Sequence, residues 1–209
     1  MGSSKRQDIN DVALAYMEQK YGEEFEYAAP QSDVLAGTHE FWATCDSLPG
    51  RKVLVQIENY RSDTNKIFRD NYIAIKYKDE STEFFRNCAT NVFGEAEVFY
   101  EVANGGQSPE LPADATLEEY LADTRVPFVI MIEVKESDFL SKEQAGQVGE
   151  SIAESGADFF LTLVVVEDSV YGTFTRKTLN EQIPLRQFIE CASVTKLNGE
   201  ITTDWLRKE

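Results

Sequence analysis

The fold of this chain is decided by the stretch Val126–Asp168, which reads VPFVIMIEVKESDFLSKEQAGQVGESIAESGADFFLTLVVVED. It contains two apolar runs, Val126–Val134 and Phe159–Val166, both rich in Val, Ile and Phe. The runs are nearly continuous rather than alternating, which is typical of strands that are covered on both faces. We therefore expect two buried strands, separated by about two dozen residues that include a helix.

The helix between these strands has recognisable start and stop signals. Ser141 and Gln144 have the spacing of a capping box, and Gly156 is a natural left-handed stop. A strand, a helix and a second strand in this order favour a parallel pair of strands joined by a crossover. The sequence therefore predicts one β-α-β unit in this half of the chain.

The N-terminal half predicts a second, smaller sheet. Residues 8–21 have the period of an amphipathic helix, and residues 40–46 and 52–59 alternate as the strands of an antiparallel hairpin. Ile67–Tyr77 continues the alternation as a third strand, and a helical stripe at 81–93 is expected to cover the apolar face of this meander. The predicted fold class is α+β, with two small subdomains of mostly antiparallel sheet and helices packed on them.

The linker signals divide the chain into segments. Asn104–Ala115 (NGGQSPELPADA) has two glycines, two prolines and no apolar period, which indicates a boundary. Thr178–Leu185 is ambiguous, because a helical turn there is interrupted by Pro184, whereas Asn198-Gly199 predicts a tight terminal hairpin. The expected segments are a tail or expression remnant at 1–7, an N-terminal subdomain at 8–103, a linker at 104–115 and a C-terminal subdomain at 116–209.

The charge of the chain excludes several classes of partner. The sequence has 20 basic and 37 acidic residues among 209, a net charge of −17. Affinity for nucleic acid comes largely from neutralising phosphates, and binding to anionic lipid needs basic clusters, so we expect neither kind of partner. No apolar run is long enough for a transmembrane segment, and the first residues contain no hydrophobic region of a signal peptide.

The cysteines and the single histidine suggest no catalytic or metal centre. Cys45, Cys88 and Cys191 form no CxxC pair, so buried free thiols are expected, with a Cys45–Cys88 disulfide left open as an alternative. His39 has no candidate nucleophile beside it, and no calcium-loop pattern is present. We therefore expect no cofactor, no metal site and no catalytic residue. Trp42 remains as a weak binding candidate together with Tyr72, if both lie on an open sheet face.

Two phrases of the sequence resemble a known group of proteins. They are Tyr16–Phe25 (YMEQKYGEEF) and Phe68–Tyr72 (FRDNY), followed by Lys76 and by a helix that ends at Phe93-Gly94. Residues 10–100 are similar in this respect to uncharacterised lipoproteins of Gram-positive gut bacteria. The resemblance implies an extracytoplasmic domain, anchored to the membrane through a lipidated cysteine upstream of this chain. It implies no activity.

These observations leave the function open. The leading hypothesis is a non-enzymatic, extracytoplasmic binding or interaction module of unknown ligand, because no reactive cluster of side chains can be recognised. One alternative is a hydrolase that uses paired carboxylates, since 37 acidic residues offer many pairs that the sequence does not distinguish. The other alternative is a structural subunit of a cell-surface assembly. The oligomeric state is not indicated.

Overall fold

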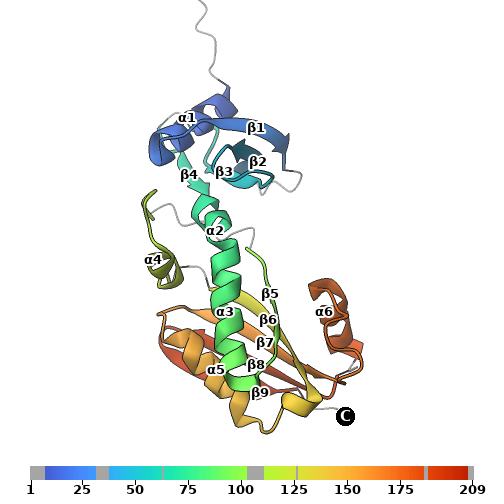
Figure 1. Cartoon of the computed structure of the whole chain (residues 1–209). Helices are drawn as coiled ribbons and strands as arrows, with labels where there is room; N and C mark the ends of the chain where they lie inside the picture. The colour runs from blue at the N-terminus through green and yellow to red at the C-terminus, as the bar shows by residue number, and fades with distance from the viewer. Residues whose placement is uncertain are drawn as a thin grey trace, which may run out of the picture. The chain divides into compact units, whose positions relative to one another are not determined.

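The computed structural model describes residues 8–31, 38–62, 64–102, 111–125, 127–185 and 188–206. The fold is α+β and divides into two compact units (Figure 1). The first unit comprises residues 1–76 and 104–115, and the second unit comprises residues 77–103 and 116–209. No helix of the described residues has both the length and the apolar character that crossing a membrane requires.

The first unit is a four-stranded antiparallel sheet with one long helix. Its elements are α1 (Ile9–Tyr21), β1 (Phe25–Pro30), β2 (Thr38–Cys45), β3 (Val53–Glu58), β4 (Ile67–Asp70) and α2 (Tyr72–Lys76). The strand order is β1-β2-β3-β4, which confirms the predicted meander and adds β1 at its edge. Helix α1 begins where Asp8 accepts a hydrogen bond from the Asn10 N–H and ends at Gly22, whose φ of 72° is left-handed.

The expected third strand, Ile67–Tyr77, is wrong beyond Asp70. The chain turns into helix α2 there, because polar side chains bind nearby backbone groups instead of continuing the ladder. Asp70 Oδ1 accepts a hydrogen bond from the Tyr72 N–H at 3.0 Å, and Asn71 Oδ1 accepts one from the Leu54 N–H at 2.7 Å. The alternation of Ile73, Ile75 and Tyr77 suggested a strand, but the Asp-Asn pair ends it.

The second unit is a five-stranded mixed sheet. Its elements are α3 (Lys78–Phe93), β5 (Glu97–Tyr100), α4 (Leu117–Leu121), β6 (Phe128–Lys135), a 3-10 turn at Glu136–Asp138, α5 (Glu143–Ala153), β7 (Phe159–Val166), α6 (Arg176–Leu185), β8 (Glu190–Leu197) and β9 (Glu200–Trp205). The strand order is β5-β6-β7-β8-β9. Strands β6 and β7 are parallel and the other pairs are antiparallel, which confirms the predicted β-α-β unit and the terminal hairpin.

The start of α5 differs from the predicted capping box. Gln144 Oε1 accepts hydrogen bonds from the Leu140 and Ser141 N–H groups, at 2.6 and 3.1 Å. The helix itself begins at Glu143, and its N-cap residue Lys142 makes no side-chain capping bond. The Gln144 side chain therefore makes its part of the predicted capping box, whereas the N-cap residue makes no side-chain bond. Gly156 follows the helix with a φ of 90°, as expected for the stop.

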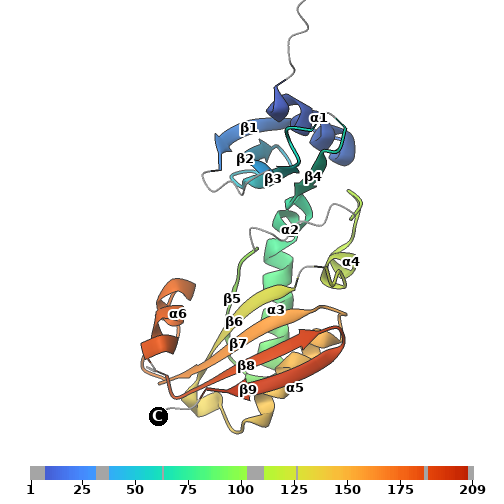
Figure 2. The same cartoon turned by 180° about the vertical axis from the view of Figure 1, so that it is seen from behind.

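The two faces of the second sheet are covered unequally. Helices α3 and α5 cover one face, which we call the inner face, and α6 is set apart from both of them (Figure 2). On the opposite, outer face, Val164 and Val166 are buried in a small cluster with Leu179 of α6. Val129 and Phe160, on the same outer face, remain 38% and 41% exposed. The expected cover on both faces is therefore present at Val164 and Val166, beside α6, and incomplete at Val129 and Phe160.

Helix α3 belongs to the second unit, which corrects the expected subdomain boundaries. Phe85, Ala89 and Phe93 of α3 are buried in one core cluster with residues of β5, β6 and β7. Strand β5 pairs with β6, so residues 77–102 follow the second sheet although they precede the expected linker. Of that linker, Leu111–Ala115 group with the first unit, and residues 103–110 lie outside the described residues, as do 1–7.

Candidate functional site

In the first unit, the phrases that carry the resemblance contact one another. Asp70, which is 2% exposed, accepts hydrogen bonds from Lys20 Nζ at 2.8 Å and from the Tyr21 hydroxyl at 2.6 Å. Burial raises the pKa of Tyr21, and the neighbouring Asp70 carboxylate raises it further. These bonds tie the end of α1 to the junction of β4 and α2. Lys20, Tyr21 and Asp70 therefore help to hold the fold of this unit together.

Tyr72 belongs to the same polar network and is not a surface aromatic residue. It is 7% exposed, and its hydroxyl donates a hydrogen bond to Glu23 Oε1 at 2.7 Å. Burial raises the pKa of Tyr72 to about 12. Burial alone would raise the pKa of Glu23, but hydrogen bonds from Ser47 and Tyr72 hold it below its ordinary value. The placement of Tyr72 on an open strand face is thus wrong, because the residue lies in α2.

Trp42 is the other aromatic candidate, and it is half-buried. Its indole Nε1–H donates a hydrogen bond to Gln31 Oε1 at 2.9 Å. Its cross-strand neighbour on β3, Leu54, is 1% exposed. Since Trp42 lies on a strand and Tyr72 in a buried helical turn, the two do not share one open sheet face.

His39 lies at the start of β2. Its Nε2 atom is 2.7 Å from Asn10 Oδ1, and its ring contacts Phe41 and Tyr60. An amide and two rings supply neither a nucleophile nor a carboxylate to orient the imidazole. The described partners of His39 are therefore those of a packed residue near the edge of the core.

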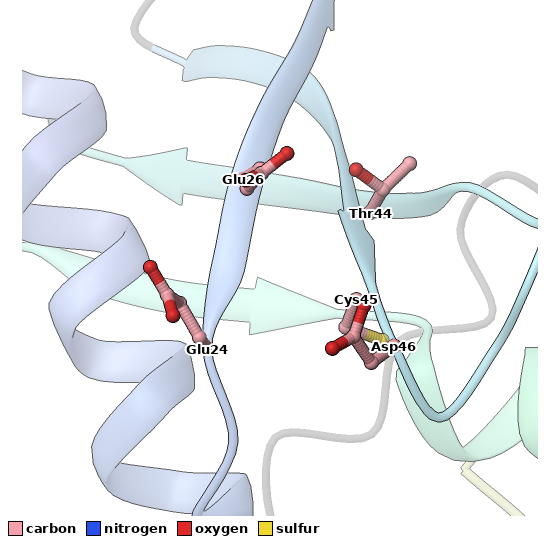
Figure 3. Close-up of a pocket in the computed structure, with 5 residues that line it drawn as sticks. All are labelled: Glu24, Glu26, Thr44, Cys45 and Asp46. Atoms are coloured by element: carbon pink, nitrogen blue, oxygen red, sulfur yellow. The ribbon is translucent and has the colours of Figure 1, made fainter.

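An acidic hollow of about 150 Å³ lies where β1 and β2 meet. Figure 3 shows Glu24 and Glu26 along one segment and Thr44, Cys45 and Asp46 along its neighbour. Within the parts of the chain that the structure describes, no three His, Cys, Asp or Glu side chains converge as metal ligands. The hollow therefore reads as a solvated acidic surface.

The three cysteines are free in the structure. Cys88 and Cys191 are buried, and Cys45 is partly exposed. The alternative of a Cys45–Cys88 disulfide is thus not realised. Burial raises the pKa of all three thiols, for Cys191 to about 12. Thiols of raised pKa are poor nucleophiles at neutral pH.

A groove of about 380 Å³ lies beneath α6 in the second unit. Its floor consists of the β6 and β7 residues Val129, Met131 and Thr162, and its wall of the α6 residues Arg176, Lys177 and Asn180, with Glu101 beyond β5 at the rim. The groove opens beside the exposed outer face, because Val129 is the register neighbour of Phe160 on β7. Apolar and polar groups thus meet in one concave surface, which we call the α6 groove.

Helix α6 is held over the sheet by few contacts. Leu179 and Ile183 pack against Met131 and Val164, and the helix starts at a Thr175 hydroxyl that accepts a hydrogen bond from the Thr178 N–H at 3.2 Å. The segment before the helix is anchored by a hydrogen bond from the Gly172 N–H to Glu133 on β6. The apolar contacts of α6 with the sheet therefore come from this small cluster.

Glu133 is a buried carboxyl on the outer face. It has no exposed surface, its Oε1 atom accepts a hydrogen bond from the Gly172 N–H at 3.0 Å, and its Oε2 atom has no hydrogen-bond partner. Burial raises the pKa of this carboxyl, the Gly172 bond opposes the shift, and Glu97 on β5 adds to it. Glu133 therefore fixes the turn that leads into α6 and resists ionisation there.

Sequence reasoning did not identify the α6 groove. The interruption by Pro184 hid a helix that runs from Arg176 to Leu185 with the proline in its last turn. One signal was available: Thr175 and Thr178 have capping spacing, and Leu179 and Ile183 follow at helical spacing. The partner strands of this short apolar face could not be deduced, because they depend on the sheet order.

The comparisons with known proteins indicate no activity. No protein-family model matches the chain, and no curated protein sequence matches it. The chain is similar to the crystal structure of a DUF5037 family protein from Ruminococcus gnavus, at 13% sequence identity and a TM-score of 0.42. The similarity covers 94% of this chain and 95% of that one. At this level the similarity carries no argument, and none of the comparisons supports the lipoprotein resemblance.

Proposed function

We propose that this protein is a non-enzymatic binding module and that the α6 groove is its ligand site. The observation that carries the proposal is the meeting of an apolar floor, Val129 and Met131, with the polar wall of α6 in a hollow of about 380 Å³. Ligand sites of small molecules are typically concave, largely apolar and provided with a few polar groups that orient the ligand.

The exposed outer face supports the same location. Val129 and Phe160, at 38% and 41% exposure, are register neighbours at the mouth of the groove. Exposed apolar residues that cluster mark binding surfaces more often than single ones do. A ligand that enters the groove would cover Val129, which lines it, and would lie next to Phe160.

The two alternatives have less support. Hydrolysis by paired carboxylates requires two acids on either side of the bond, and Glu101 is the one carboxylate among the described groove residues. A structural subunit would use the outer face for a second protein instead. Light scattering on the isolated chain, and on mixtures with envelope extract, separates that alternative from a monomeric binder.

We also propose an extracytoplasmic location and an upstream lipid anchor, which are supported by the sequence resemblance to lipoproteins alone. Fractionation of the host cells, followed by detection with an antibody against this chain, tests both. Membrane-associated protein that is released by a lipase treatment supports them, and protein in the soluble cell interior refutes them.

Fluorescence of anilinonaphthalene sulfonate (ANS), an amphipathic anion, tests whether the native groove binds ligands. We compare Val129→Glu, which places a charge on the groove floor, with Ile67→Glu, which changes a 43% exposed apolar residue of the other unit. Val129→Glu should weaken ANS binding about fivefold or more, and Ile67→Glu should leave it unchanged. Equal effects of the two variants, with folding verified by circular dichroism, would refute the groove as the site.

A further inference from the structure

We infer that the ligand of the α6 groove is an amphipathic carboxylate, which replaces Glu101 as the partner of Arg176. The inference rests on the proposed function, because it names the class of ligand for that same groove. Three features support it: the charges of the lining residues, the geometry of one ion pair and the apolar floor.

The lining of the groove is positive in a strongly negative protein. Arg176 and Lys177 contribute two positive charges and Glu101 one negative charge, whereas the chain as a whole carries −17. Asn180 and Thr162 add groups that can donate hydrogen bonds to an anion. The two cationic side chains and the additional donors outweigh the single carboxylate in the lining, so the groove favours an anion over a cation.

The ion pair of Arg176 is incomplete. Its Nη1 atom lies 2.7 Å from Glu101 Oε2, at ion-pair distance, yet this nitrogen has no hydrogen-bond partner in the structure. A guanidinium has five donors arranged to hold a carboxylate through two parallel bonds. Arg176 therefore retains donors that a better-placed carboxylate can use.

A ligand can displace Glu101 from its ion pair with Arg176. Its side chain is 65% exposed, whereas that of Arg176 is 25% exposed. An ion pair with one partner largely in water contributes little stability, because water and salt screen the attraction and solvate that partner when it separates. A ligand carboxylate can thus take the place of Glu101, and the displaced side chain turns into solvent without leaving a buried charge.

The apolar floor defines the rest of the ligand. Val129 and Met131 lie beneath the charged wall, and Phe160 continues the apolar surface outward. The ligand therefore has an apolar chain or ring of moderate size next to its carboxylate. Medium-chain fatty acids and the C-terminal carboxylates of apolar peptides share this chemistry.

Isothermal titration calorimetry with three eight-carbon probes tests the charge class. Octanoate carries the carboxylate, octanol is its uncharged analogue and octyltrimethylammonium is the cationic one. We expect octanoate to bind at least about tenfold more tightly than octanol, and Arg176→Gln to remove that difference. Arg86→Gln, which removes an exposed arginine of α3, is the matched control and should preserve it.

The variant Glu101→Gln distinguishes exchange from simple attraction. It removes the internal competitor and should tighten octanoate binding by about two- to fivefold, with little effect on octanol. An unchanged or weaker affinity for octanoate in this variant overturns the exchange. Because Glu101 is exposed, the variant should fold normally, so this arm holds even if Arg176→Gln is unstable.

Failure of the inference can be told apart from failure of the proposed function. If octanol binds as tightly as octanoate and Val129→Glu weakens both, the groove is a ligand site but the carboxylate class is wrong. If no probe binds in a way that depends on Val129, the proposed function itself is wrong. The affinity of N-acetyl-leucyl-phenylalanine is also compared with that of its amide, as octanoate is compared with octanol. The larger of the two affinity differences shows whether the groove prefers a peptide terminus or a fatty acid.

Discussion

Replacing Asp70 by Asn should destabilise the first unit selectively. The substitution removes the charge that faces Lys20 Nζ, whose side chain is only 12% exposed, and turns an amide toward that ammonium group. One oxygen remains to accept the hydrogen bonds of Tyr21 and Tyr72. The dominant effect is therefore a buried lysine left without its counter-charge.

The expected cost is large compared with that of a surface pair. Breaking a buried ion pair from one side typically costs about 3–5 kcal/mol. The nearby pair of Arg69 and Glu58, with side chains 34% and 32% exposed, provides the matched control. Glu58→Gln should cost no more than about 1 kcal/mol, because solvent screens that pair. The double variant Lys20→Met, Asp70→Asn should recover part of the loss, since no buried charge is then left alone.

Urea unfolding with a single tryptophan reports on each unit separately. The chain has two tryptophans, Trp42 in the first unit and Trp205 in the second. In a Trp205→Phe background, Asp70→Asn should lower the midpoint of the Trp42 transition by about 2 M. In a Trp42→Phe background, the Trp205 transition should keep its midpoint.

The reasoning would be refuted by a small or unselective effect. A loss no greater than that of Glu58→Gln would mean that the Lys20–Asp70 pair is as solvated as a surface pair. An equal shift of both tryptophan transitions would mean that the two units do not unfold as the separate cores of this structure.

Three further predictions concern single positions. Gly149→Ala should destabilise the second unit by about 1–3 kcal/mol, because the added Cβ would lie 2.7 Å from Val194 Cγ1. Gly146→Ala in the same helix adds a Cβ that meets no other atom, so thermal unfolding should show a gain of about 0.5–1 kcal/mol in stability. Burial raises the folded-state pKa of Glu133, so ionising this carboxyl costs stability above its unfolded pKa of about 4.3. Glu133→Gln should therefore raise the melting temperature most at neutral pH, and the gain should disappear as the pH falls toward 4. A gain that increased on acidification would contradict the raised pKa. In the native protein a thiol reagent should modify Cys45 much faster than the two buried thiols, as peptide mass mapping would show.

The sequence predicts well the elements whose signals are local. Strand β7 has the predicted bounds, Phe159–Val166, and α1, at Ile9–Tyr21, matches the helix predicted over residues 8–21. The Asn198-Gly199 turn takes the left-handed φ values, 52° and 86°, that its hairpin requires. In each case the residues that determine the structure are neighbours in the chain.

The sequence predicts poorly the features that depend on distant partners. The apolar stripe of α3 is clear, but nothing in it specifies which of two sheets it covers. Tyr72 follows an alternating pattern, but its backbone N–H donates a hydrogen bond to the Asp70 side chain and the residue lies in a helix. The α6 groove depends on β6, β7 and a helix nearly fifty residues after the start of β6, so no local signal could reveal it.

The most direct test of the central proposal is a map of amide chemical-shift changes during a titration of the full, isotope-labelled chain with octanoate. We predict that the largest changes belong to Met131, Thr162 and Asn180, and that residues of the first unit stay still. Changes that centre on the first unit, or that spread over the whole surface in proportion to exposure, would contradict the assignment of the ligand site to the α6 groove.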